Sequence, residues 1–437
     1  MIRSKRKAVP ALAALALTAA ACGGGGGGGG GGGSSAPGIT KDKILIGSHY
    51  PLTGPAAPGY SEIGPAADAY FKYVNAHGGI YGRKIEFKYL DDAYDPSKTS
   101  SVVRQLVLKD NVFAIYNGLG TPTHSAVVDF LNAQKVPDLF VASGCLCWDK
   151  PKEHPWTFGW QIDYVREGKI LGKYVKEHFA GKKVAYFYQN DEFGKDGVKG
   201  LDYEIPKDMV VARQSYQPGN TNIGPQVSAL RSSGADVVVS FTIPAFTALL
   251  RLNSLKIGYK PKLVVSNVGS DPITLSGLLE QFAKKSGEKV SGSSLIEGMV
   301  TDGYLPSLGE ESNDWIKLFK KVHDKYDPKA PFDGNVLYGE ASAYAFVQSM
   351  MKAGKNPTRE DVVKAVESGL PQGPVVAPYA FSDSDHSGMT GAYIGVINGG
   401  EIVRKGPVYV TDTSPSGPVK AYEGGAQQPP PNGIPSP

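Results

Sequence analysis

The feature that most restricts the fold of this chain is a repeated alternation of strand and helix patterns. Short apolar segments rich in Val, Ile, Tyr and Phe alternate with amphipathic segments as far as residue 266, and the pattern restarts after Trp156. Strands separated by helices pair in parallel, and the helices then cover both faces of the sheet. The sequence therefore predicts an α/β protein with two doubly wound lobes. Strands are expected at Lys43–Ser48, Lys84–Leu90, Val112–Tyr116, Pro137–Val141, Lys183–Tyr188, Met209–Gln214, Asp236–Phe241 and Lys262–Ser266.

Helices are expected between these strands and again near the C-terminus, where apolar residues recur at helical spacing. They are predicted at Ile63–Ala76, Ser97–Lys109, a segment that ends near Gln134, Tyr164–His178, Glu192–Tyr203, Ile223–Ser232, Pro244–Leu255, Asn313–Tyr326, Asn335–Ala353 and Arg359–Ser368. Further β-rich segments are expected at Val375–Phe381, Ala392–Asn398 and Glu401–Val408. Proline, glycine and polar residues dominate from Thr411, so residues 411–437 are expected to form a disordered tail.

The N-terminus has the pattern of a secretory signal. A basic start is followed by an apolar stretch that is too short for a stable membrane span, and then by Ala-Ala-Cys22. This end resembles the lipobox of bacterial lipoproteins, which implies a signal peptide at 1–21 and a lipid on Cys22. Ala19 stands where that family usually has leucine, and a plain secretory signal is the alternative. Eleven glycines follow, so residues 22–38 are interpreted as a flexible tether.

The charge balance argues against nucleic acid as a partner. The 46 basic residues exceed the 42 acidic ones only because four basic residues lie in the N-terminal signal. The remaining chain has equal numbers of both and therefore no general attraction for polyanions.

Two neighbouring strands are predicted to end in turns of small and polar residues. Asn117-Gly-Leu-Gly-Thr-Pro-Thr follows the strand at Val112–Tyr116, and Ala142-Ser-Gly-Cys-Leu-Cys-Trp follows the strand at Pro137–Val141. Ligands of open parallel sheets bind outside the carboxyl ends of the strands. A ligand site is therefore expected here, with the Thr121 hydroxyl as a carboxylate-binding group or as a helix N-cap. His124, one turn further on, is expected at the rim or in solvent.

Six segments together resemble the branched-chain amino-acid (Leu/Ile/Val) family of substrate-binding proteins, which have the type I periplasmic binding protein fold. The resemblance implies two lobes joined by a three-strand hinge, with residues 39–159 and 301–373 in lobe 1 and residues 160–300 and 374–410 in lobe 2. The segments are IGSHYPLTGPAA, NAHGGIYGRKIEFKYLDDAYDP, NGLGTPT, PDLFVASG, YQNDEFGKDGVKGL and NVLYGEASAYAFVQSM.

The same resemblance implies a set of ligand-binding residues. Thr121 matches the carboxylate-binding hydroxyl, and Ser143 and Cys145 match positions that contact the polar head of the ligand. Tyr60 and Phe193 match aromatic positions that flank the ligand, although either ring also suits a core. Further cleft candidates are Thr242, Tyr338 and Tyr164.

One departure from the family bears on the ligand. Val268 stands where amino-acid-binding members have a glutamate that pairs with the ligand ammonium group. A buried ammonium without a carboxylate partner is costly. We therefore expect a carboxylate or amide ligand without an α-amino group, unless Asp271 replaces the missing glutamate.

Cys145 and Cys147 are the only cysteines after Cys22, and outside the cytoplasm they form either a disulfide or two free thiols. The histidines lack metal-ligand spacing, and Asp383–Gly388 lacks the final glutamate of a calcium loop. The chain also has no P-loop or nucleophile elbow. We expect neither a metal nor a cofactor, and no enzymatic activity.

The sequence as a whole predicts an extracytoplasmic, lipid-anchored solute-binding protein of an ABC importer. Its expected partners are a small amino acid or a carboxylate or amide solute, an ABC permease, and the membrane through the N-terminal lipid. It is expected to be a monomer. The alternative is a ligand-binding sensor of the same fold that signals to a membrane receptor.

Overall fold

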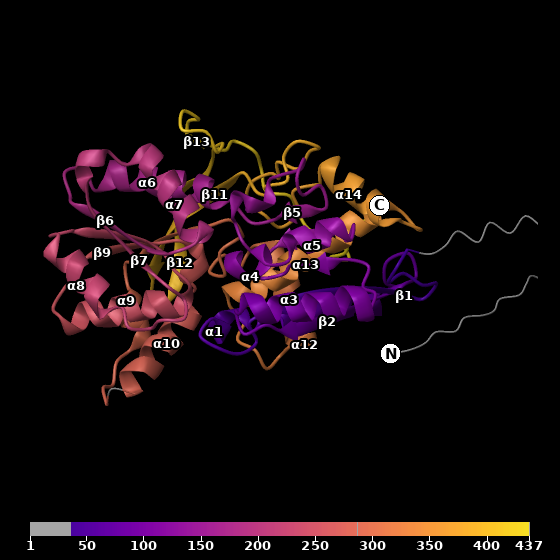
Figure 1. Ribbon diagram of the computed structural model, residues 1–437, viewed down its shortest axis with the longest axis horizontal. Coiled ribbons are helices and arrows are strands. Elements are labelled where there is room, and N and C mark those ends of the chain that lie inside the picture. Colours follow the sequence, from indigo (N-terminus) through magenta and orange to yellow (C-terminus); the bar gives the residue numbers. More distant parts are fainter. Residues whose placement is uncertain (1–35, 286, 437) are drawn as a thin grey trace, which may run out of the picture. The chain divides into compact units, whose positions relative to one another are not determined.

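The protein is described here by a computed structural model of residues 36–285 and 287–436 (Figure 1). The expected signal peptide, Cys22 and most of the tether lie outside the described residues. Within those residues, no helix is both long and apolar enough to cross a bilayer. The strands form one sheet with the order β2-β1-β3-β4-β5 and a second with the order β13-β12-β11-β10-β9-β8-β6-β7.

The first sheet is parallel throughout. Its strands are β1 (Lys43–Tyr50), β2 (Lys84–Asp91), β3 (Ile115–Tyr116), β4 (Asp138–Val141) and β5 (Thr157–Gly159). The helices of this half are α1 (Ala57–Tyr60), α2 (Ile63–Ala76), α3 (Pro96–Arg104), α4 (Thr121–Ser125) and α5 (Val128–Ala133). Three helices from much later in the chain join them, because α12 (Asp314–Tyr326) and α13 (Gly334–Ala353) pack on α2, and α14 (Arg359–Glu367) packs on α13.

The second sheet is parallel from β7 to β10 and antiparallel beyond. Its strands are β6 (Val184–Gln189), β7 (Val210–Tyr216), β8 (Val237–Phe241), β9 (Lys262–Val265), β10 (Val300–Gly303), β11 (Gly391–Asn398), β12 (Glu401–Val410) and β13 (Lys420–Ala421). The helices of this half are α6 (Tyr164–His178), α7 (Glu192–Glu204), α8 (Gly224–Ser232), α9 (Pro244–Lys256), α10 (Pro272–Lys285) and α11 (Gly292–Ile296).

The two sheets repeat one topology. In the first the parallel order is β2-β1-β3-β4-β5, and in the second it is β7-β6-β8-β9-β10, so in each half the second strand lies outside the first. Strand order therefore reverses next to β1 in one sheet and next to β6 in the other. Such switch points leave a crevice at the carboxyl ends of the strands, where ligands bind.

Helix α13 is the most buried helix of the first half, and its packing depends on a glycine. Asp333 caps its N-terminus by accepting hydrogen bonds from the Asn335 and Val336 amides. At Gly339 an added Cβ would lie only 2.5 Å from the Ile63 carbonyl oxygen of α2. The two helices therefore approach more closely than any larger residue at position 339 allows.

Three local expectations differ from the structure. The helix expected to end near Gln134 is broken into α4 and α5, because Val127 leaves helical geometry with φ −129°. Val375–Phe381 forms no strand, and within it only Tyr379 makes an isolated bridge, to Met389. Helices α10 and α11 were not anticipated, although α10 has a regular amphipathic pattern.

The segment expected to be a disordered tail is packed against the protein. Ile434 is 8% exposed and belongs to the hydrophobic core. The Gly433 and Asn432 carbonyls accept hydrogen bonds from the Tyr70 and Tyr73 hydroxyls of α2, each at 2.7 Å. These bonds use backbone acceptors, which every residue type provides, and the amino-acid composition therefore gives no sign of them.

The close approach of α13 and α2 can be tested with a pair of helical Gly→Ala variants. Gly339→Ala forces a methyl group into the Ile63 carbonyl, and we expect it to lower the free energy of unfolding by about 1–3 kcal/mol. Gly277→Ala on α10 is the control, because an added Cβ there meets nothing within 4 Å. It should raise stability by up to about 1 kcal/mol through helix propensity. Denaturant unfolding measures both, and equal effects would contradict the packing argument.

Candidate functional site

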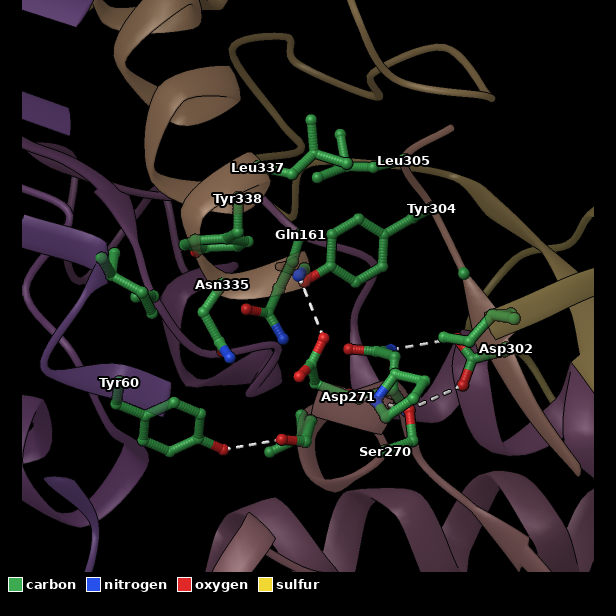
Figure 2. Close-up of a pocket in the computed structure, with 18 of the residues that line it drawn as sticks. Tyr60, Gln161, Ser270, Asp271, Asp302, Tyr304, Leu305, Asn335, Leu337 and Tyr338 are labelled. Carbon is green, nitrogen blue, oxygen red and sulfur yellow. Dashed lines mark hydrogen bonds between the residues drawn. The ribbon is translucent and has the colours of Figure 1, made fainter. Parts of the chain in front are cut away.

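A cavity of about 360 Å³ lies where the carboxyl ends of both sheets meet (Figure 2). Its walls are made largely of residues that directly follow strands. Tyr94, Thr121 and Ala142 follow β2, β3 and β4 of the first sheet. Phe193, Ile243, Val268 and Tyr304 follow β6, β8, β9 and β10 of the second sheet. The cavity therefore coincides with the crevice that the repeated topology creates.

The cavity is mainly apolar and carries acidic but no basic side chains. Aromatic and aliphatic residues form most of its surface, as in binding sites for small organic molecules. Asp271, Asp302 and Glu401 line it, whereas no Lys, Arg or His is found among the described residues that do so. A bound anion would therefore find no cationic side chain in the cavity wall.

The predicted hydroxyl pair lies at the first-sheet side of the cavity. Thr121 lines the cavity at the start of α4, and its hydroxyl is 2.6 Å from the Ser143 hydroxyl, which follows β4. Ser143 lies behind Thr121 and does not itself line the cavity. Of the two predicted hydroxyls, Thr121 alone is in direct reach of a ligand.

The position of Thr121 is fixed by a buried row of two histidine and two aspartate side chains beneath α4, joined by hydrogen bonds. His49 Nδ1 is 2.7 Å from Asp92 Oδ2, and His49 Nε2 is 3.0 Å from His124 Nδ1. His124 Nε2 in turn is 2.8 Å from Asp138 Oδ2, and all four residues are fully buried. Burial lowers the pKa of His49. The expectation that His124 lies at the rim or in solvent is wrong, because this residue ties α4 to β1 and β4.

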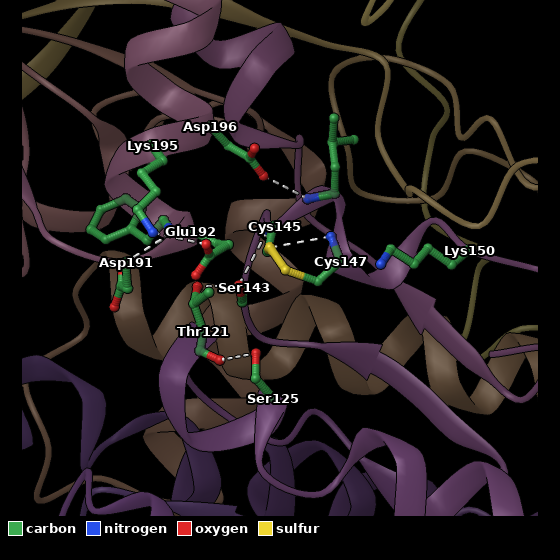
Figure 3. The surroundings of a disulfide bond; sticks show 12 residues. Thr121, Ser125, Ser143, Cys145, Cys147, Lys150, Asp191, Glu192, Lys195 and Asp196 are labelled. Carbon is green, nitrogen blue, oxygen red and sulfur yellow. Dashed lines mark hydrogen bonds and ion pairs between the residues drawn. A yellow bond between two sulfur atoms is a disulfide. The ribbon is translucent and has the colours of Figure 1, made fainter. Parts of the chain in front are cut away.

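Cys145 and Cys147 are joined by a disulfide beside the hydroxyl pair (Figure 3). Cys145 is 3% exposed and does not line the cavity. The turn between the two cysteines contacts the second half, since the Leu146 amide donates to Asp196 Oδ2 of α7 at 3.0 Å. Burial raises the pKa of Asp196 to about 6. The structure thus places Cys145 behind the site and not in contact with the cavity.

Four of the predicted aromatic residues line the cavity. Tyr60 donates its hydroxyl to the Val268 carbonyl at 2.8 Å, a bond between α1 and the segment after β9. Phe193 packs on Tyr164 with ring centroids 4.6 Å apart. The Tyr338 hydroxyl accepts a bond of 3.2 Å from the Asn117 side chain. All four rings belong to the hydrophobic core as well as to the cavity wall.

Thr242 lies outside the cavity wall. It is fully buried, and its hydroxyl is 2.7 Å from that of Thr247 on α9. Its neighbour Ile243 lines the cavity instead. Successive side chains at the end of a strand point in opposite directions, so an error of one residue selects the wrong side chain. The strand pattern did not show whether Thr242 or Ile243 faces the cavity.

Asp271 joins the two halves at the cavity. Its carboxylate accepts hydrogen bonds from the Thr274 amide at 2.7 Å and from the Gly334 amide at the start of α13 at 3.0 Å. Burial, followed by the charge of Asp333, raises the pKa of Asp271 to about 6. The pKa of Asp333 rises to about 7, through burial and then the charge of Glu62. These carboxyl groups have no cationic partner that would keep their pKa values low.

A second pair of buried acids consists of Asp302, which lines the cavity, and Glu167, which lies behind the cavity wall. Glu167 and Asp302 both accept hydrogen bonds from Asn267, whose side-chain amide is 2.9 Å from each. Burial and the Asp302 charge raise the pKa of Glu167 well above its ordinary value. The pKa of Asp302 is also raised, chiefly by burial. Both carboxyl groups therefore hold a proton more readily than they would in water, and their hydrogen bonds to Asn267 support the loop after β9.

The sequence analysis missed several polar residues of the cavity. Four of them, Gln161, Asn267, Asp302 and Tyr304, come from segments that the strand–helix pattern leaves as connections. The fifth, Asn335, is the first residue of a predicted helix, and nothing in the helical pattern indicated that its side chain faces a cavity.

The profile of the family described as periplasmic binding protein matches residues 43–401. The chain belongs to this family. The protein is similar to the Leu/Ile/Val-binding protein homolog 3 of Brucella melitensis biotype 1, with 23% identity over 78% of this chain and 88% of the relative. It is also similar to homolog 7 of Brucella abortus, with 27% identity over 71% of this chain and 77% of the relative.

Solved structures share the fold. One is a branched-chain amino acid ABC transporter protein from Thermus thermophilus with bound valine, with TM-score 0.72, 19% identity and coverage of 86% of this chain and 98% of that one. Another is a fatty acid ABC transporter substrate-binding protein from Thermomonospora curvata, with TM-score 0.72, 22% identity and coverage of 87% and 95%. The fold is that of type I periplasmic binding proteins, as expected from the sequence, and the family implies an extracytoplasmic location.

The raised pKa of Asp333 predicts a specific pH dependence of stability. Asp333 ionises near pH 4 in the unfolded chain but keeps its proton to about pH 7 in the folded protein. The unfolded state therefore loses its proton first as the pH rises, and stability falls between pH 4 and 7. Asp333→Asn, which retains an N-cap oxygen, should remove up to about 4 kcal/mol of this fall.

The measurement is denaturant unfolding of both proteins across this pH range. Asp314→Asn is the control, because Asp314 opens α12 with its side chain 55% exposed. Identical pH slopes for the wild type and Asp333→Asn would contradict the assignment.

Proposed function

We propose that this protein is the solute-binding component of an ABC importer. It captures a small amino acid or a carboxylate or amide solute between two lobes and delivers it to the permease. The observation that carries the proposal is the cavity at the joined carboxyl ends of two parallel sheets, with walls from both. The family membership and the similarity to Leu/Ile/Val-binding protein homologues support the same function.

The two lobes of the proposal are residues 39–159 with 301–373 and residues 160–300 with 374–410. The hydrogen bonds that cross between them at the cavity include those from Tyr60 to the Val268 carbonyl, from the Gly334 amide to Asp271, and from Asn335 to Thr274. A solute that contacts both walls adds to these bonds and stabilises the arrangement in which the lobes meet. That arrangement is the form that the permease recognises, since a ligand shifts the equilibrium by its differential affinity.

The location of the protein in the proposal follows from its N-terminus. Cleavage before Cys22 and lipidation of that cysteine would anchor the chain to the membrane. The glycine-rich residues 23–33 would then let the binding domain move above the membrane surface.

The cavity wall narrows the choice of solute. The mainly apolar surface suits a short aliphatic or aromatic group, and the structural neighbours include a protein with bound valine and a fatty acid ABC transporter substrate-binding protein. Asp271 offers a carboxylate within three residues of Val268, so an ammonium group would find a partner there. The hydroxyl of Thr121 offers a hydrogen bond to a polar head group.

A thermal-shift screen over amino acids, carboxylates and amides tests the proposed function. A solute at 100 times its dissociation constant stabilises the protein by about 2.7 kcal/mol, which raises Tm measurably. We expect at least one of these solute classes to do so. A complete screen without any shift, on protein whose folding is confirmed by circular dichroism, would contradict the proposal.

A pair of Thr→Val variants locates the binding event. Thr121→Val removes a hydroxyl from the cavity wall, and we expect it to weaken binding of the solute found in the screen by about 5- to 30-fold, equivalent to about 1–2 kcal/mol. Thr242→Val removes a hydroxyl of the same kind that is buried against Thr247, outside the cavity. It should change the affinity less than about 3-fold. Calorimetric titration measures both, and equal effects would place the solute elsewhere.

A further inference from the structure

One side-chain amide in the cavity has no hydrogen-bond partner among the described residues. Gln161 lies between β5 and α6, in the connection from the first sheet to the second, and is 5% exposed. It lines the cavity, and Figure 2 shows its amide group pointing into the open space. No hydrogen bond joins this amide to any other described residue.

An amide that faces an open cavity can be hydrogen-bonded by water there, and a solute that displaces this water must replace its hydrogen bonds or leave the amide unsatisfied at a cost in free energy. The Gln161 amide presents one acceptor oxygen and two N–H donors, whichever way the group is turned. In the cavity these atoms are accessible to a bound solute. The amide is therefore best satisfied by a solute group that both donates and accepts hydrogen bonds.

The groups around Gln161 offer the same combination. Tyr304 points its hydroxyl toward the amide from the second-sheet side (Figure 2). Asn335 donates its side-chain N–H groups to Thr274 Oγ1 at 3.1 Å and Asp333 Oδ2 at 3.3 Å, so its own oxygen remains an acceptor. Asp271, also directed into this space, adds acceptor oxygens. Acceptors and donors thus face the solute together.

Charged head groups fit this environment less well than a neutral one. A carboxylate would face Asp271 and Asp302 without any cationic side chain among the described lining residues. An ammonium group would pair with Asp271 but, being a donor only, would leave the Gln161 N–H groups unsatisfied. A carboxamide accepts through its carbonyl and donates through its N–H groups, and satisfies both ends of Gln161.

We propose that Gln161 is a specificity-determining residue that pairs with an uncharged amide group of the solute and so selects carboxamides over carboxylates. This inference rests on the proposed function and names the solute class of the same cavity. The apolar walls would hold the aliphatic or aromatic remainder of the solute.

The test is calorimetric titration with two pairs of probes that differ only in the head group, hexanamide against hexanoate and benzamide against benzoate. In the wild type we expect at least one amide to bind ten-fold or more tightly than its acid. Gln161→Leu should weaken amide binding at least ten-fold and bring the amide-to-acid ratio to within about 3-fold of unity. Gln161→Met, which keeps an unbranched side chain, should do the same and serves if the leucine variant does not fold.

Gln348→Leu is the matched control. Gln348 is 6% exposed on α13 and has an unpartnered side-chain oxygen, yet it does not line the cavity. Its replacement should leave the amide-to-acid ratio unchanged, whatever it does to stability. The ratio thus separates a role in selection from a role in folding.

Three results would overturn the inference alone. Acids that bind as tightly as their amides, or a ratio that survives the loss of Gln161, would leave a solute-binding protein with another basis of selection. Binding of leucine without binding of either amide would have the same meaning. No binding of any probe in this experiment or in the solute screen would overturn both the inference and the proposed function.

Discussion

The constraint on which the rest of the structure depends is the meeting of two parallel sheets at their carboxyl ends. Each sheet carries the same strand order, and each reverses direction next to its first strand. The backbone groups and side chains that follow the strands therefore point into one shared cavity. Because both halves contribute to its walls, anything that binds there is sensitive to how the halves meet.

The electrostatics of this cavity are unusual because acids are buried without basic partners. Burial raises the pKa of Asp271 to about 6 and, with the charge of Glu62, that of Asp333 to about 7. Glu167 and Asp302 share Asn267 as a hydrogen-bond donor, and the pKa of each carboxyl group is raised, chiefly by burial. Burial thus favours the neutral form of these carboxyl groups. An anionic solute would find no cationic side chain among the described residues of the cavity wall, whereas a neutral solute needs none.

The sequence placed the cavity in the correct region but named its residues with mixed success. Thr121, Tyr60, Phe193, Tyr164 and Tyr338 line the cavity, whereas Ser143, Cys145 and Thr242 lie directly behind the wall. Ser143 and Thr242 each adjoin a lining residue, and Cys145 is three residues from Ala142, so a strand-end turn decides which neighbour points inward. Gln161 lies in no motif, and it becomes part of the site only because the two halves enclose it.

The sequence by itself determined the parallel α/β class, most strands and helices, and the edge of the sheets where the cavity lies. These features follow from apolar periodicity and from turns of small residues, which are local properties of the chain. Only the tertiary structure decided that the C-terminal segment packs on α2, that His124 is buried between His49 and Asp138, and that a glutamine without a partner among the described residues faces the cavity. Such features depend on contacts between residues far apart in the chain, and those contacts cannot be inferred from local periodicity.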